Sequence, residues 1–116
     1  MAVIGFSDKA DHIWHGRGWV FRQILDDVAS KYPEDPEMIE EFRQAKHYYN
    51  GLSIYSLDPN LASRVTSAIR EVAEGILAGT IRSGIHDEPH NDEAIFEGYR
   101  ERLRELIDTI NRATGS

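Results

Sequence analysis

The amino-acid sequence predicts an all-α protein, either a four-helix antiparallel bundle or a closely related helical array. Apolar residues recur at steps of three and four in four separate stretches, which is the spacing of one helical face. Two of these stretches open with Asp-Pro, a pair that suits the cap and the first position of a helix. Helices of about 13–22 residues joined by short connections pack side by side, so we expect a bundle.

The central helix of this bundle is predicted over residues 58–79. Asp58 is expected to cap it, Pro59 suits its first position, and Gly79 is a suitable stop. Its apolar face comprises Leu61, Val65, Ala68, Ile69, Val72, Ile76 and Leu77. This face needs to be covered, so we expect the other segments to pack on it.

The start of the chain gives weaker signals. Residues 1–6 form a short apolar arm that adopts a strand-like shape or lies over the core, and too few strand signals follow for a sheet. Ser7 is expected to cap a short helix beginning at Asp8. Gly16 and Gly18 then interrupt it, because glycine costs roughly 1 kcal/mol against alanine inside a helix.

Three further helices are predicted from the spacing of apolar residues and from residues that start or stop helices. Proline and Asn-Gly signals end the first two, and a polar cap opens the last. Residues 80–90 contain Gly84 and Pro89 and are expected to form an irregular loop. The helices are expected from Trp19 to Tyr32, from Asp35-Pro36 to Asn50, and from Asn91 or Asp92 to Ile110.

Bulk composition limits the classes of function. A chain of 116 residues is long enough for one domain, predicted over residues 1–116. A net charge of −7 argues against nucleic acid and anionic membranes as partners and favours a protein with a basic surface. No cysteine is present, which excludes thiol catalysis and fits the cytoplasm. No apolar run approaches the about 20 residues that span a bilayer.

One cluster of possible metal ligands lies between His86 and Glu93. His86 and His90 offer imidazoles beside several carboxylates, a mixture that suits zinc, manganese or iron. The alternative is an exposed loop in which Asn91 or Asp92 caps the last helix.

A second set of possible metal ligands consists of glutamates with helical spacing. Glu37, Glu40 and Glu41 lie on one predicted helix, and Glu71 and Glu74 lie on the next. Facing each other, such pairs hold a divalent ion against a triphosphate and orient a water. The arrangement resembles that of four-helix nucleotide pyrophosphohydrolases, although the closing aspartate of that family is absent. The resemblance implies a metal-dependent hydrolase, with solvent exposure of these glutamates as the alternative.

Polar and aromatic residues near the N-terminus are also open to two interpretations. His12 and His15 are half of a metal site or ordinary surface residues. Arg17, between two glycines, suits an anion-binding site or a hinge. Trp14 and Trp19 flank this point; an exposed tryptophan would indicate a binding surface, and two buried ones would belong to the core.

The first functional hypothesis is therefore a small acidic cytoplasmic protein that acts by associating with another protein, as a regulator, adaptor or toxin-neutralising partner. We assign no catalytic residue, no cofactor and no nucleic-acid or membrane partner, and expect a homodimer because two-fold dimers are the commonest assemblies. The alternative hypothesis is the metal-dependent hydrolase of nucleotides or similar phosphorylated substrates, with a divalent metal as its cofactor.

Overall fold

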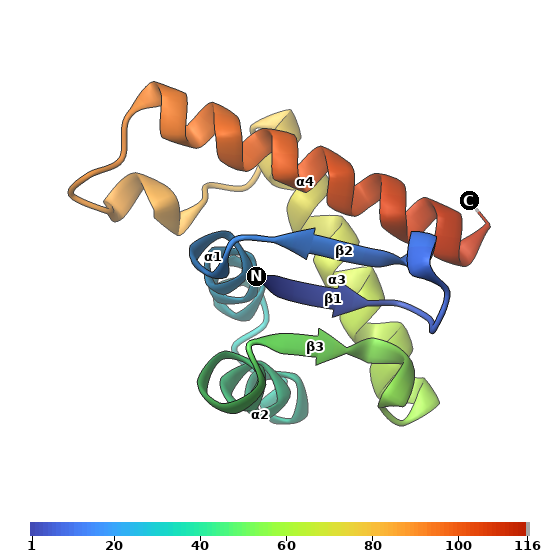
Figure 1. The fold of residues 1–116 in the computed structure, drawn as a ribbon. Helices are drawn as coiled ribbons and strands as arrows, with labels where there is room; N and C mark the ends of the chain where they lie inside the picture. The colour runs from blue at the N-terminus through green and yellow to red at the C-terminus, as the bar shows by residue number, and fades with distance from the viewer. Residues whose placement is uncertain (116) are drawn as a thin grey trace.

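The computed structural model describes residues 1–115, which form four α-helices and a three-stranded mixed sheet (Figure 1). The helices are α1 (Gly18–Lys31), α2 (Pro36–Gln44), α3 (Pro59–Ala78) and α4 (Glu93–Thr114). The strands are β1 (Ala2–Gly5), β2 (Ile13–Gly16) and β3 (Gly51–Ser53). Shorter helical segments are η1 (Ala10–His12), η2 (Ala45–Tyr49), η3 (Ile54–Ser56) and η4 (Gly84–Asp87).

The prediction of an all-α bundle is wrong, because the described chain contains this sheet and is an α+β structure. The strand order is β2-β1-β3, with β1 antiparallel to β2 and parallel to β3. The apolar arm of residues 1–6 therefore contains the central strand. The helix expected from Asp8 is replaced by the short turn η1 and strand β2.

Alternation along the strands places one face of the sheet on the core. Ile4 pairs with Trp14 on one side and with Leu52 on the other, and all three side chains are buried. The opposite face, toward the viewer in Figure 1, carries Val3 between His15 and Gly51. This face is less buried, as the period of two in a strand requires.

The predicted helix boundaries are confirmed where capping residues mark them. Asp35 accepts a hydrogen bond from the Met38 amide, and Asp58 accepts one from the Asn60 amide. Asp92 caps α4 in the same way. Gly79 ends α3 with a φ of 81°, in the left-handed region that glycine adopts without strain.

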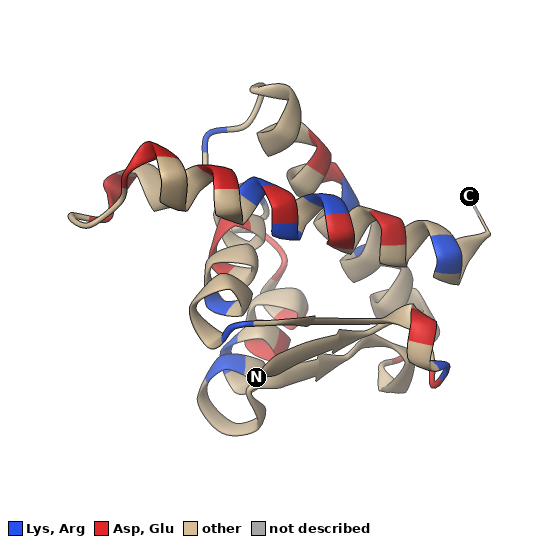
Figure 2. Cartoon of the chain, turned by 45° about the horizontal axis from the view of Figure 1, so that its top comes forward, with Lys and Arg blue, Asp and Glu red and all other residues tan. Residues whose placement is uncertain are grey.

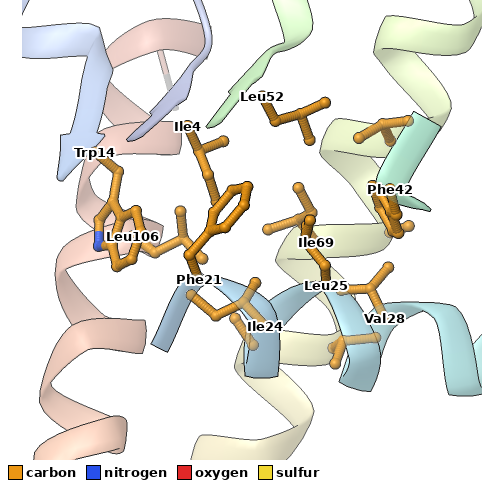
Figure 3. Close-up of a cluster of buried hydrophobic side chains, with 14 of the residues drawn as sticks. Ile4, Trp14, Phe21, Ile24, Leu25, Val28, Phe42, Leu52, Ile69 and Leu106 are labelled. Atoms are coloured by element: carbon orange, nitrogen blue, oxygen red, sulfur yellow. The ribbon is translucent and has the colours of Figure 1, made fainter. Parts of the chain in front are cut away.

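The core lies between the sheet and the four helices (Figure 3). The sheet contributes large side chains from above, and α1 contributes them from below in that view. Trp14 also ties β2 to α4, because its indole Nε1 donates to the backbone oxygen of Arg102 at 3.2 Å. The labelled members of the cluster are Ile4, Trp14, Phe21, Ile24, Leu25, Val28, Phe42, Leu52, Ile69 and Leu106.

Within residues 1–115, none of the helices combines the length and the apolar character that crossing a membrane requires.

The segment that follows α3 folds back closely onto that helix. The amide of Ile81 donates to the Gly75 carbonyl at 3.1 Å, and Thr80 donates to the same oxygen at 2.8 Å. A Cβ added at Gly75 would lie 2.4 Å from Ile81 Cδ1. The missing side chain at residue 75 therefore makes room for Ile81.

Gly75→Ala is expected to lower the free energy of unfolding by about 1–3 kcal/mol, because the added methyl group overlaps Ile81. Gly98→Ala is the matched control within α4, since a Cβ there meets nothing within 4 Å. Alanine at residue 98 is expected to stabilise the helix by about 0.5–1 kcal/mol. Urea unfolding followed by circular dichroism measures both changes. Stabilisation by both substitutions would contradict the close packing at Gly75.

Candidate functional site

A buried carboxylate connects α1 to the segment that leads into α4. Asp27 is only 6% exposed. Its Oδ2 accepts hydrogen bonds from the Ser83 hydroxyl at 2.6 Å and the Tyr99 hydroxyl at 2.7 Å. Its Oδ1 accepts from the Gly84 amide at 2.8 Å and the Gln23 side-chain nitrogen at 3.0 Å. Four donors take the place of the water that this charge loses on burial.

Tyr99 connects the buried carboxylate of Asp27 to an exposed aromatic side chain. Burial, together with the charge of Asp27, raises the pKa of the Tyr99 phenol well above its usual value, so the hydroxyl remains a donor. The Tyr99 ring lies 6.5 Å, centroid to centroid, from the ring of Trp19. Trp19 is 43% exposed, whereas Trp14 is buried. Of the two tryptophans, Trp19 therefore meets the condition for a binding surface, and Trp14 belongs to the core.

A groove of about 590 Å³ opens beside Trp19, between α1 and the segment that carries η4 and the start of α4. We call it the α1 groove. The wall on the α1 side is formed by Arg17, Trp19, Arg22, Gln23 and Asp26. The opposite wall is formed by Ile85, Glu88, His90, Asn91 and Ile95. Gln23 and the residues next to Ile85 are bound to Asp27, so the buried carboxylate fixes the spacing of the two walls.

Two arginine side chains in the α1 groove have no partner within residues 1–115. Neither the Arg17 nor the Arg22 guanidinium makes a hydrogen bond or ion pair with a described residue. Arg17 is the cap residue of α1, and its side chain makes no cap bond. The Arg22 side chain lies beside Gly18, because its Nη1 is 3.4 Å from the position that an added Cβ would take there. Figure 2 shows blue segments near the N-terminus, whereas blue and red alternate along α4.

The two acidic residues of the groove differ in whether they have an ion-pair partner. Asp26 is paired with Lys46, whose Nζ lies 2.6 Å from Oδ1. Glu88 has no ion-pair partner among the residues described, and it stands on the wall opposite the arginines. The groove therefore offers two free positive charges on one side and one free negative charge on the other.

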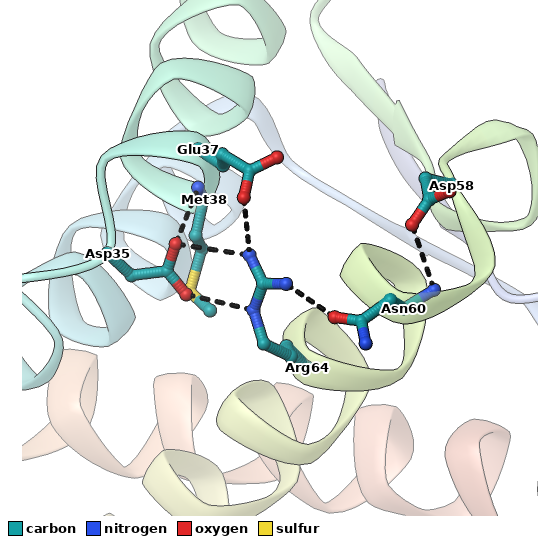
Figure 4. A network of polar contacts seen from close by, with 6 residues as sticks. All are labelled: Asp35, Glu37, Met38, Asp58, Asn60 and Arg64. Atoms are coloured by element: carbon teal, nitrogen blue, oxygen red, sulfur yellow. Dashed lines mark hydrogen bonds and ion pairs between the residues drawn. The ribbon is translucent and has the colours of Figure 1, made fainter.

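The glutamates predicted to hold a divalent metal are divided among separate partners. Glu37 and Asp35 both bind Arg64 in the first half of α3 (Figure 4). Glu71 lies seven residues after Arg64, which is about 10 Å along a helix. It accepts a hydrogen bond from the hydroxyl of Tyr32 at the end of α1. The structure therefore brings Glu37 and Glu71 to different places on α3.

The remaining glutamates of that set also lie apart. Glu40 is bound through both oxygens by Arg43, which lowers the pKa of Glu40 to about 2. Glu41 lines a hollow beside β3, and Glu74 lies 4.0 Å from Arg70. The Tyr32 phenol has its pKa raised to about 12 by burial and by its bond to Glu71.

The histidines of the two sequence clusters do not converge on one another. His86 packs its ring on Phe96 at a centroid distance of 4.4 Å, and His90 lines the α1 groove. His12 bonds the Ser7 hydroxyl at 2.8 Å in η1, while His15 lies on the open face of β2. Within residues 1–115, no group of three or more His, Cys, Asp or Glu is placed to hold a metal ion.

Comparison with protein-family models, with curated proteins and with solved structures gives no match to this chain.

Sequence reasoning missed the buried carboxylate and the groove that it supports. Arg17 and Trp19 were predicted to have possible binding roles, but Arg22, Asp27 and Tyr99 were not. Asp27 does lie among apolar residues of the α1 face, between Ile24 and Val28. A charged residue at such a position is a usable signal, because burial requires compensating donors.

Asp27→Ala is expected to lower the free energy of unfolding by about 3 kcal/mol or more, because it leaves several buried donors without an acceptor. Tyr99→Phe removes one donor to a charged group and is expected to cost about 1.5–3 kcal/mol. Ser30→Ala, an exposed change on the same helix, is the control and is expected to stay within about 0.5 kcal/mol. Chemical unfolding measures all three. A loss for Asp27→Ala no larger than that of the control would contradict the role of the buried carboxylate.

Asp35→Asn is expected to destabilise the protein at neutral pH but not at acid pH. Asparagine keeps the helix cap and loses the ion pair with Arg64. The Arg64 hydrogen bonds hold the pKa of Asp35 below its usual value. A depressed pKa stabilises the folded state above the unfolded pKa, and this contribution disappears as pH falls through the folded pKa.

Thermal unfolding of both proteins, from neutral pH down to about pH 2, checks this expectation. The two midpoints are expected to converge as the carboxylate of Asp35 takes up a proton. A gap between the midpoints that stays constant with pH would show that the ion pair contributes nothing.

Proposed function

We propose that this chain is a small binding protein that acts by associating with another protein through the α1 groove. The observation that carries the proposal is an exposed tryptophan, Trp19, that lines the groove with two arginines whose side chains have no partner among the described residues. Tryptophan and arginine are enriched among the residues that contribute most to protein–protein binding.

The groove supports this function in size and in rigidity. About 590 Å³ is room for a few side chains of a partner. The hydrogen bonds to Asp27 hold the walls before a partner arrives, which reduces the ordering cost of binding. The Trp19 ring also lies beside the buried ring of Tyr99, which gives it an aromatic neighbour within the chain.

The charge of the remaining surface supports a partner with a basic face. The chain carries a net charge of −7, and long-range attraction between opposite charges speeds the encounter of two proteins. The cytoplasm is the compartment that we propose, because the chain contains no cysteine.

A homodimer is part of the same proposal. The apolar faces of α3 and α4 would be candidates for a dimer contact, but in the described structure these helices pack against one another within one chain. A dimer would therefore use a different surface. Light scattering coupled to size-exclusion chromatography tests it, and a monomeric mass at all concentrations would remove it.

Trp19→Ala is expected to weaken binding of the cellular partner by tenfold or more, because truncating a tryptophan at an interface centre costs about 2 kcal/mol or more. The wild type, Trp19→Ala and Tyr48→Ala are compared as baits in extract of the source organism. Tyr48 is the control, since it is 69% exposed and does not line the groove.

The captured protein is then purified and its dissociation constant is measured with each variant. Circular dichroism and the unfolding midpoint establish that Trp19→Ala is folded. The result that supports the proposal is one partner lost with Trp19→Ala and kept with Tyr48→Ala. A set of captured proteins identical for all three baits would overturn it.

A further inference from the structure

We propose that the α1 groove binds an acidic segment of the partner protein, with an Asp or Glu carboxylate on Arg17 and Arg22 and a neighbouring apolar side chain against Trp19. This inference rests on the proposed function and adds the chemistry of the partner at that site.

The inference depends on which arginines have an ion-pair partner within the described chain. Seven other arginines each have a carboxylate within 4.0 Å, namely Arg43, Arg64, Arg70, Arg82, Arg100, Arg102 and Arg104. The guanidinium groups of Arg17 and Arg22 have neither a carboxylate nor another hydrogen-bond partner within residues 1–115. On a chain of net charge −7, two unpaired arginines lining one groove form a local reversal of charge. Guanidinium groups bind carboxylates with paired, charge-assisted hydrogen bonds.

The apolar part of the groove favours a ligand that carries an apolar side chain as well as a carboxylate. The exposed ring of Trp19 lies on one wall, and the exposed Ile95 and the buried Ile85 lie on the other. A carboxylate alone would leave these surfaces in water. An aliphatic or aromatic side chain next to the carboxylate covers them and gains hydrophobic free energy.

Polar groups of the groove favour a peptide. The Gln23 side-chain nitrogen donates a hydrogen bond to Asp27, and its side-chain oxygen accepts no hydrogen bond within residues 1–115. This oxygen is an acceptor, and peptide amides are donors. Glu88 on the opposite wall repels a ligand that carries several negative charges, such as a phosphate chain.

The inferred partner surface is thus basic over most of its area and acidic at one point. Such a reversal of sign fixes the register of two docked surfaces, because any shifted arrangement brings like charges together.

Selection from a library of random peptides, displayed on phage and panned on the purified full chain, tests the inference. Peptides that combine Asp or Glu with an adjacent apolar residue are expected to be enriched. Their affinity, measured by titration calorimetry, is expected to fall about tenfold or more with Arg22→Gln and with Arg17→Gln. Lys31→Gln is the matched control, because it removes from α1, outside the groove, one positive charge that has no ion-pair partner within residues 1–115. Glu88→Gln is expected to strengthen binding, since it removes the opposing charge.

The two tryptophans report where the peptide binds. In nitrogen-labelled protein, the indole signal of Trp19 is expected to move on titration with an enriched peptide. The indole of Trp14 is buried and bonded to Arg102, so its signal is expected to stay in place. AMP and inorganic phosphate, added separately at the peptide concentration, are expected to shift Trp19 less than the peptide does.

Several results would overturn the inference. These are enrichment of basic or uncharged peptides, affinities equal for the arginine variants and Lys31→Gln, or a larger Trp19 shift with AMP or phosphate than with peptide. If the peptides fail while Trp19→Ala still loses the cellular partner, the acidic segment is wrong and the proposed function stands. If both fail, the proposed function falls as well.

Discussion

The carboxylate of Asp27 is a buried charge satisfied by hydrogen-bond donors, and the placing of the chain between α3 and α4 depends on it. Its donors come from α1, from the turn at Ser83 and Gly84, and from Tyr99 on α4. The backbone hydrogen bonds of Thr80 and Ile81 to Gly75 fix the start of this segment, and the hydrogen bonds to Asp27 fix its middle. The apolar contacts of Ile81 and Ile85 add to this anchoring.

The helical part of the fold was predictable because its signals are local. Each Asp-Pro start and each Gly stop acts within a turn, and the apolar periodicity runs through several turns. The sheet was not predictable in this way. Its strands have four, four and three residues, too few for alternation to be read. Glycines at residues 5, 16 and 51 weaken the strand signal further, and the parallel pairing of Val3 with Gly51 is a contact between distant parts of the chain.

The site shows the same division between local and distant information. The proposals for Arg17 and Trp19 came from neighbouring residues, and the structure places both in the α1 groove. The glutamate set was grouped by spacing along two helices. Spacing says which residues share a helical face, and it does not say which arginines of other elements occupy those carboxylates. The groove itself has one wall from α1 and one from residues 85–95, so only the tertiary structure reveals it.

The order of strands in the sheet has a consequence for synthesis on the ribosome. The central strand precedes both of its neighbours in the sequence, and alone with β2 it makes a two-stranded hairpin that is marginal in water. Its other neighbour follows α1 and α2 in the sequence, and α3 and α4, which complete the core against the sheet, follow later still. The indole of Trp14 gains its hydrogen bond to Arg102 only when α4 is in place, so during synthesis the apolar face of this hairpin is completed only by the last helix described.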